Sequence, residues 1–237
     1  MVQFDSLPGL SFAAMNSVML RAVPKHEIHR KLLHGLVIIL PLSVFYGPYL
    51  FGLERNFLVS ITFFLFMASL LVELLRLGND SFGQWFYSTF GSMLRDEERQ
   101  SLTGATYVAG ATFICAWLST ISEEFAACAC LSLTLFILGD AAAALIGKSI
   151  GRIFVGKKTV EGAVGCFVLC SFLAYWAFPM LPLFLLKWGG EISFFQASII
   201  GLSIALLELF PAKLGRFKLN DNLYVPVVVT YLSVLIR

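Results

Sequence analysis

The stretch from Leu138 to Gly162 decides how the rest of the chain is interpreted, and it reads LGDAAAALIGKSIGRIFVGKKTVEG. It places a carboxylate, Asp140, in an otherwise apolar run and then passes through small residues and glycines into a basic segment. A charge inside a membrane helix costs about 2.5–3.5 kcal/mol on insertion scales, so such a residue usually has a function. A glycine-rich basic loop can bind phosphate through backbone N–H groups and cations. The stretch therefore predicts a phosphate-transfer site at one face of a membrane.

The composition predicts a membrane protein with several spans. Of the 237 residues, 58% are hydrophobic and only 14% are charged, whereas a soluble domain carries about 25% charged residues. The net charge is only +2, so we expect no nucleic-acid partner. All five cysteines lie in apolar runs, where cysteine behaves as a small hydrophobic residue, and we expect no disulfide framework.

Seven apolar runs are long enough, or nearly so, to cross a bilayer, which takes about 20 residues. They are Leu32–Phe51, Asn56–Leu75, Leu102–Ser119, Phe125–Gly147, Ala163–Leu186, Phe194–Phe210 and Leu223–Ile236. We therefore expect an all-α, polytopic membrane helical bundle with about seven transmembrane helices. Residues 1–31 would form a cytoplasmic or interfacial N-terminal segment. Residues 32–237 would form a single transmembrane catalytic domain with a nucleotide-binding loop at 139–162, and Asp80–Phe90 a short surface helix.

The basic residues orient this arrangement. Fourteen of them lie in the N-terminal segment and the even-numbered connections: Arg21, Lys25, Arg30, Lys31, Arg76, Arg95, Arg99, Lys148, Arg152, Lys157, Lys158, Lys213, Arg216 and Lys218. The other three lie in the remaining connections and at the C-terminus: Arg55, Lys187 and Arg237. The positive-inside rule then places the N-terminus in the cytoplasm and the C-terminus outside.

Ionisable groups from separate spans converge on the expected cytoplasmic side. Asp140 lies eight residues before Lys148, and hence about 12 Å from the end of its span at 1.5 Å per residue. Glu208 and Asp221 lie near the corresponding ends of the sixth and seventh spans, and His34 lies one turn into the first. This convergence predicts a polar cavity that is open to the cytoplasm.

Phosphoryl transfer requires cations on the phosphate charge, a metal between phosphates and an in-line acceptor. Carboxylates suit Mg²⁺, which takes one or two of them together with phosphate oxygens and water. Asp140 is the first candidate for a metal ligand, and Glu161 and Asp221 are weaker candidates for the metal or for positioning the acceptor hydroxyl. Lys157 and Lys158 would bind the phosphates. Three glycines would let the backbone approach them closely, namely Gly147, Gly151 and Gly156.

Each of these candidates also has a purely structural interpretation. Gly147 and Gly151 fit the G-x-x-x-G spacing of packed helices, and Lys148 and Arg152 suit the anchoring role of basic residues at the cytoplasmic face. Asp140 could instead form a structural ion pair with a Lys or Arg. Two other carboxylates at span ends have a basic residue nearby in sequence, Glu73 with Arg76 and Glu208 with Lys213.

The segment GDAAAALIGKSIGRIFVGKKTVEG resembles the nucleotide-binding segment of the CTP-dependent lipid kinases, the group that contains dolichol kinase, phytol kinase and CTP-dependent diacylglycerol kinase and is related to phosphatidate cytidylyltransferase. Its Lys-Lys-Thr-x-Glu-Gly ending is most similar to the dolichol kinase branch. The matching positions are Gly139, Asp140, Ala143, Gly147, Gly151, Lys157, Lys158, Thr159, Glu161 and Gly162. Two weaker elements also resemble the family, Arg30, Lys31 and His34 at the first span, and Asp221, Asn222 and Pro226 near the end.

This resemblance implies CTP as phosphoryl donor, a divalent metal such as Mg²⁺ and a membrane-embedded lipid alcohol as acceptor. It assigns catalysis to Asp140, Lys157, Lys158, Glu161 and Asp221, with Asp140 and Glu161 on the metal. Among the matching positions, it assigns nucleotide binding to Gly139, Gly147, Gly151, Lys157, Lys158, Thr159 and Gly162. The basic residues Lys148 and Arg152 of the same segment are further candidates for phosphate binding. It assigns the lipid substrate to Arg30, His34 and Asn222. Eukaryotic dolichol kinases carry many more spans before this part, so the chain is expected to resemble the catalytic part alone, as in short bacterial relatives.

We expect a kinase that phosphorylates a polyprenol or dolichol-type alcohol at the cytoplasmic face of the bacterial inner membrane, or of the endoplasmic reticulum in a eukaryote. Three alternatives remain open: cytidylyl transfer onto a lipid phosphate, phytol or diacylglycerol as acceptor, and an ion-coupled transporter whose carboxylates carry protons or cations. Besides its lipid substrate, the expected partners are membrane lipids, and a homo-oligomer stays an open alternative.

Overall fold

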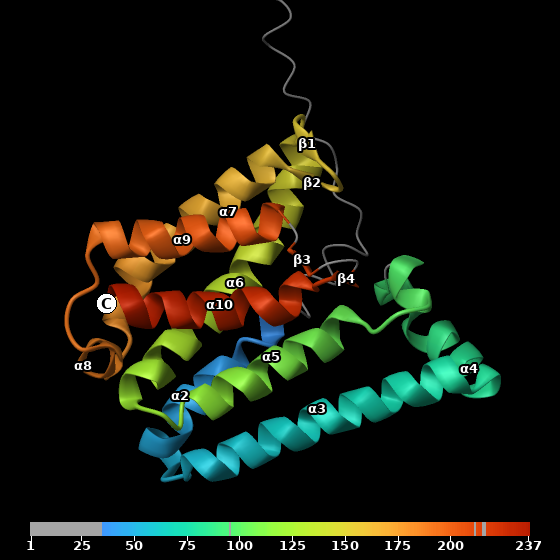
Figure 1. The fold of residues 1–237 in the computed structure, drawn as a ribbon, viewed down its shortest axis with the longest axis horizontal. Helices are drawn as coiled ribbons and strands as arrows, with labels where there is room; N and C mark the ends of the chain where they lie inside the picture. Colours follow the sequence, from blue (N-terminus) through green and yellow to red (C-terminus); the bar gives the residue numbers. More distant parts are fainter. Residues whose placement is uncertain (1–34, 95, 211, 215–216) are drawn as a thin grey trace, which may run out of the picture.

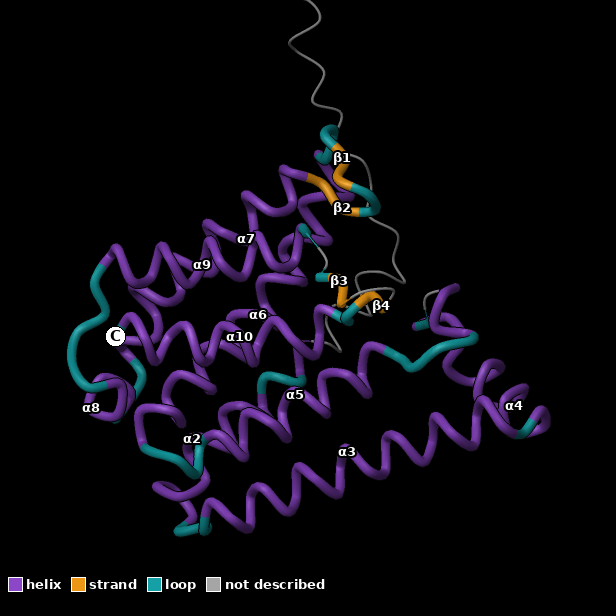
Figure 2. Tube along the Cα trace, viewed as in Figure 1, coloured by secondary structure: helices purple, strands orange, loops and turns teal. Residues whose placement is uncertain are grey.

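The computed structural model describes residues 35–237 except 95, 211 and 215–216. This part of the chain is 81% helical with almost no strand, which confirms the all-α class (Figures 1 and 2). The helices are α2 (Ile39–Phe51), α3 (Arg55–Gly78), α4 (Asp80–Phe90), η2 (Gly91–Met93), η3 (Asp96–Arg99), α5 (Gly104–Leu118), α6 (Glu123–Ile150), α7 (Val160–Phe172), η4 (Leu173–Ala177), η5 (Phe178–Met180), α8 (Phe184–Trp188), α9 (Phe194–Leu209) and α10 (Asp221–Ile236). The short helix α4 confirms the expected helix at Asp80–Phe90.

Two small antiparallel hairpins interrupt the helices, and the sequence did not predict them. Strand β1 (Phe154–Val155) pairs with β2 (Lys158–Thr159), and β3 (Lys213–Leu214) pairs with β4 (Phe217–Lys218). Each hairpin lies at one end of the bundle, in the connections α6–α7 and α9–α10 (Figure 2). These two connections contain many of the Lys and Arg residues that lie between the apolar helices.

Three helices are long and apolar enough to cross a membrane: α3, α6 and the continuous helix Val160–Met180. Four further apolar helices, α2, α5, α9 and α10, have 13, 15, 16 and 16 residues. These are shorter than the roughly 20 residues that a full crossing takes. The described residues therefore contain three helices that could cross a membrane, which is consistent with a membrane protein, and the count of seven spans and their orientation stay predictions.

The fifth apolar run is shorter as a helix than the sequence predicted. The span expected to reach Leu186 ends at Met180, after a π-helical turn and a short 3₁₀ segment. Pro179 and Pro182 have no backbone N–H to donate, so they cannot continue the helical ladder. Leu183 then takes a left-handed conformation with φ 62° before the separate helix α8.

Helix α6 is the centre of the bundle, and α3 lies at its edge (Figure 1). Of the most apolar 18-residue window of each helix, 61% is buried for α6 and only 17% for α3. Helix α6 is 28 residues long, which is about 42 Å. The outer face of α3 exposes large apolar side chains such as Phe64 and Leu74, as expected for a helix that faces lipid.

The bundle has two chemically different ends. At one end lie the C-terminal ends of α3, α6 and α9, the N-terminal ends of α5, α7 and α10, and both hairpins (Figure 1). At the opposite end, Glu123 accepts a hydrogen bond from Arg55 at 2.7 Å and lies 3.5 Å from Lys187. Arg237 lies 3.9 Å from Glu124 at the same end. The three basic residues assigned to the outer side therefore lie together.

Candidate functional site

The β1–β2 hairpin carries the basic part of the central motif and turns it back onto the bundle. Helix α6 ends at Ile150, and the backbone N–H of Gly151 still donates to the carbonyl of Gly147 at 3.0 Å. Gly156 takes φ 62° in the two-residue turn between the paired strands, a conformation that glycine adopts at little cost. The turn places Lys158 on β2, where its side chain reaches α9 and α10.

Lys158 joins three elements through its ammonium group. Its Nζ atom lies 2.8 Å from Oε1 of Glu208 and 2.6 Å from Oδ2 of Asp221. It also donates to the backbone carbonyl of Glu208 at 2.5 Å. The Lys158 side chain is 27% exposed, that of Glu208 6% and that of Asp221 20%. We call these three residues the Lys158 cluster. Two carboxylates face one ammonium, so the cluster carries an excess of negative charge.

Asp140 lies inside the bundle beside this cluster. It is only 9% exposed on α6, so it does not face lipid. Its carboxylate interacts electrostatically with that of Glu208 and with the thiol of Cys166 on α7. The structure therefore brings together three acids from separate helices, Asp140, Glu208 and Asp221, with one lysine from the motif. Glu208 pairs with Lys158, which is 50 residues away in sequence. Proximity in sequence had suggested Lys213 as its partner instead.

The pKa of Lys158 predicts how the cluster responds to pH. Burial lowers this pKa, but attraction to Glu208 and Asp221 outweighs burial and raises the pKa above its ordinary 10.5. A group with a raised folded-state pKa stabilises the fold fully below its unfolded pKa and loses this contribution as pH rises through the folded pKa. We expect the difference in unfolding free energy between wild type and Lys158→Met to be constant from about pH 7 to about pH 9 and to shrink above about pH 10.4. Denaturant unfolding in detergent micelles measures this difference, and a value unchanged at about pH 11.5 would contradict the assignment.

Gly147 and Gly151 pack against Thr159. A Cβ atom built on Gly147 would lie 2.5 Å from Oγ1 of Thr159, and one built on Gly151 would collide with the carbonyl oxygen of Gly147. A Cβ on Gly139 would lie 2.7 Å from Sγ of Cys170. The buried Thr159 hydroxyl in turn accepts from the backbone N–H of Gly162 at 3.1 Å and caps α7. The contacts of these glycines and of Thr159 are those of close packing between α6 and the start of α7.

Gly162 gives a direct test of this packing. A Cβ atom on Gly162 would lie 2.5 Å from the backbone carbonyl oxygen of Ala143 and 3.3 Å from its carbon. Backbone atoms cannot move aside as a side chain can, so Gly162→Ala should lower the unfolding free energy by about 1–3 kcal/mol. Gly78→Ala is the matched control, because nothing lies within 4 Å of its Cβ position, and its effect should stay within about 0.5 kcal/mol. Equal effects in denaturant unfolding would contradict the packing account.

Glu161 makes a local structural contact. Its Oε1 atom accepts hydrogen bonds from the backbone N–H groups of Arg152 at 3.0 Å and Ile153 at 3.2 Å. These bonds tie the start of α7 to the connection between α6 and β1. Within the described part of the chain, no group of three or more His, Cys, Asp or Glu side chains is arranged to hold a metal ion. The pairing of Asp140 with Glu161 on a metal therefore stays a prediction, whereas Glu161 is hydrogen-bonded to the α6–β1 connection.

The remaining candidates lie around the cluster or outside the described residues. Lys148, Arg152 and Lys157 are exposed at the ends of α6 and in the hairpin. Asn222 is 8% exposed at the start of α10. Its backbone N–H donates to the side chain of Asn220, which caps the helix, at 3.0 Å. Two candidates for the lipid substrate lie outside the described residues, Arg30 and His34.

The arrangement combines exposed cations with a buried excess of acid at one end of a helical bundle. Exposed cations attract phosphates from water, and buried carboxylates suit a hard cation or the hydroxyl of an acceptor. Comparisons of the chain with models of protein families, with curated proteins and with solved structures found no match.

Proposed function

We propose that the chain is a membrane-embedded kinase that transfers a phosphoryl group from CTP to the hydroxyl of a lipid alcohol, a polyprenol or dolichol-type isoprenoid. The observation that carries this proposal is the Lys158 cluster beside the buried Asp140, beneath the exposed basic residues of the same motif. The resemblance of the motif to the CTP-dependent lipid kinases supplies the donor and the class of acceptor.

The residues around the cluster can divide the work of phosphoryl transfer, which is mostly positioning and charge stabilisation. Exposed Lys148, Arg152 and Lys157 would meet the triphosphate as it arrives from water. Asp221 is 20% exposed and can accept the proton of an incoming hydroxyl as a general base. Lys158 would hold Asp221 in place and contribute positive charge to the nucleotide site.

The donor set of the site fits Mg²⁺ only with help from the nucleotide. Mg²⁺ takes one or two carboxylates and completes its octahedron with phosphate oxygens and water. The buried Asp140 is the residue that would hold it, with Glu208 within electrostatic range. Bound there, the metal would neutralise charge on the phosphates.

The position of the site at the ends of apolar helices suits a lipid alcohol. The tail of such an alcohol dissolves in the bilayer, and its hydroxyl stays near the interface, where a nucleotide from water can reach it. By the distribution of basic residues, we assign this interface to the cytoplasmic face.

The test is an assay of the purified protein with CTP, Mg²⁺ and a panel of polyprenol, dolichol, phytol, diacylglycerol and phosphatidate, with ATP as the control donor. We expect label from γ-labelled CTP on a polyprenol-type lipid, and none from α-labelled CTP. Label from α-labelled CTP on a lipid phosphate would replace the proposal by cytidylyl transfer. Ion flux in liposomes without nucleotide consumption would replace it by a transporter.

A further inference from the structure

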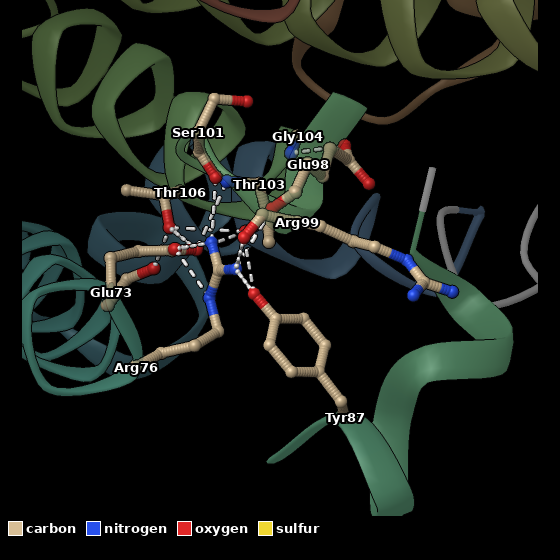
Figure 3. A network of polar contacts seen from close by, with 10 residues as sticks. Glu73, Arg76, Tyr87, Glu98, Arg99, Ser101, Thr103, Gly104 and Thr106 are labelled. Atoms are coloured by element: carbon tan, nitrogen blue, oxygen red, sulfur yellow. Dashed lines mark hydrogen bonds and ion pairs between the residues drawn. The ribbon is translucent and has the colours of Figure 1, made fainter. Parts of the chain in front are cut away.

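A second polar centre lies at the C-terminal end of α3, at the same end of the bundle as the Lys158 cluster (Figure 1), and Figure 3 shows it from close by. Glu73 and Arg76, on the last turns of α3, are 2% and 3% exposed. The Arg76 Nε atom donates to Oε2 of Glu73 at 3.0 Å, and its Nη2 atom makes a second bond to the same oxygen. Taking two charges out of water costs several kcal/mol for each ion, so the pair needs a full set of polar partners.

Arg76 finds further partners in α4 and in the connection between α4 and α5. Its guanidinium donates to the hydroxyl of Tyr87 at 2.6 Å and to the backbone carbonyls of Glu98 at 2.9 Å and Ser101 at 2.7 Å. A longer bond of 3.4 Å reaches the carbonyl of Arg99. Figure 3 shows these groups arranged around the guanidinium. One side chain thus fixes the path of the backbone before α5.

Glu73 fixes the start of α5. Its Oε1 atom accepts from the backbone N–H of Thr103 at 3.1 Å, from the Thr103 hydroxyl at 2.6 Å and from the Thr106 hydroxyl at 3.1 Å. Thr103 is the N-cap residue of α5, but its own hydroxyl makes no capping bond. The carboxylate of Glu73 therefore satisfies an N–H group that a helix start leaves without an intrahelical partner.

The start of α5 lies directly against the start of α10. The backbone N–H of Gly104 donates to Oε1 of Glu98 at 2.8 Å. A Cβ atom on Gly104 would lie 2.8 Å from Nδ2 of Asn222, and one on Gly110 would lie 3.3 Å from Cδ1 of Leu223. Any shift of α5 is therefore passed to the first turn of α10, which carries Asp221 of the Lys158 cluster.

We infer that Glu73 and Arg76 are positioning residues for the candidate site. They hold the α4–α5 connection, the connection holds Gly104 against Asn222, and this contact sets the place of Asp221 opposite Lys158. The coupling between the α4–α5 connection and the start of α10 can be tested without knowing the reaction. Its effect on turnover rests on the proposed function.

Hydrogen exchange of the full chain in detergent micelles tests the coupling. Lysine cannot match the planar fork of donors of arginine, so Arg76→Lys should speed exchange in residues 98–106 and also in 220–224. Arg55→Lys is the matched control, because it disturbs an ion pair with Glu123 at the opposite end, and it should leave 220–224 unchanged. Faster exchange in Arg76→Lys that is confined to residues 98–106 would overturn the inference. Equally fast exchange of residues 220–224 in the control Arg55→Lys would also overturn it.

Gly104→Ala tests the same coupling at the contact between Gly104 and Asn222, and it does not disturb Glu73 or Arg76. Its new methyl group should displace the Asn222 side chain and speed exchange in 220–224 while α3 keeps its protection. Unchanged exchange in 220–224 would overturn the inference even if Arg76→Lys fails to fold.

Enzyme kinetics of Gly104→Ala distinguish a positioning role from an effect on stability alone. If the protein phosphorylates lipid alcohols, Gly104→Ala should lower kcat about 10- to 100-fold, because small displacements of catalytic groups have effects of this size. The KM for CTP should change by less than about 3-fold, as expected when only the transition state is affected. A change confined to KM would overturn the positioning role. If the wild type shows no turnover, the exchange data still decide the coupling, and only the proposed function fails.

Discussion

Asp140→Asn is expected to abolish phosphoryl transfer and to leave the protein folded. The replacement keeps the shape of the side chain but removes the charge that would hold a metal on the phosphates. Asp140 is only 9% exposed on the central helix, so water cannot easily take over this role. We expect turnover to fall at least about 100-fold, which corresponds to about 2.7 kcal/mol of transition-state stabilisation.

The measurement is label transfer from γ-labelled CTP by the purified variant, after its helical content has been matched to wild type by circular dichroism. Asp80→Asn is the matched control. Asp80 is the first residue of α4 and exposed, so its turnover should stay within about 2-fold, as for an ordinary surface substitution. Near-normal turnover of Asp140→Asn would remove Asp140 from the mechanism.

Lys158→Met is expected to destabilise the fold strongly. It leaves the carboxylates of Glu208 and Asp221 close together without their shared cation. Breaking a fully buried ion pair costs about 3–5 kcal/mol. Because the Lys158 side chain is 27% exposed, water screens part of this cost, and we expect about 1–3 kcal/mol.

A double-variant cycle assigns this cost to the cluster. Adding Glu208→Gln to Lys158→Met removes one of the two uncompensated charges, so the double variant should be more stable than Lys158→Met alone. Lys157→Met is the matched control, since Lys157 is exposed in the hairpin turn and should change stability by less than about 0.5 kcal/mol. Equal losses for the two lysine variants in denaturant unfolding would show that the cluster does not stabilise the fold.

The sequence was sufficient to locate the helices, because apolar runs of this length leave few alternatives to a helix in a chain with so little charge. Each of the seven expected runs overlaps a described helix, and Asp140 lies in the bundle interior as a charge in an apolar run should. Helix ends were harder to predict. The fifth run remains apolar beyond Met180, so only Pro179 and Pro182 mark the break.

The contacts of the site could be predicted only in part, because they join distant segments. Two-residue strands are too short to show a period, so only Gly156 marked the β1–β2 hairpin. Nothing local links Lys158 to Glu208, and the identity of Gly147 does not reveal whether a phosphate or Thr159 fills the space beside it. Such pairings are decided by how α6, α7, α9 and α10 pack.

The most direct test of the central claim is whether CTP with Mg²⁺ stabilises the protein against unfolding through Asp140 and Lys158. Ligand binding to the folded state alone adds about 2.7 kcal/mol at a concentration 100-fold above Kd. We predict that CTP raises the unfolding free energy of wild type in this way and leaves Asp140→Asn and Lys158→Met unchanged. No stabilisation of wild type by CTP or any other nucleoside triphosphate, or equal stabilisation of the variants, would contradict a nucleotide site at this place.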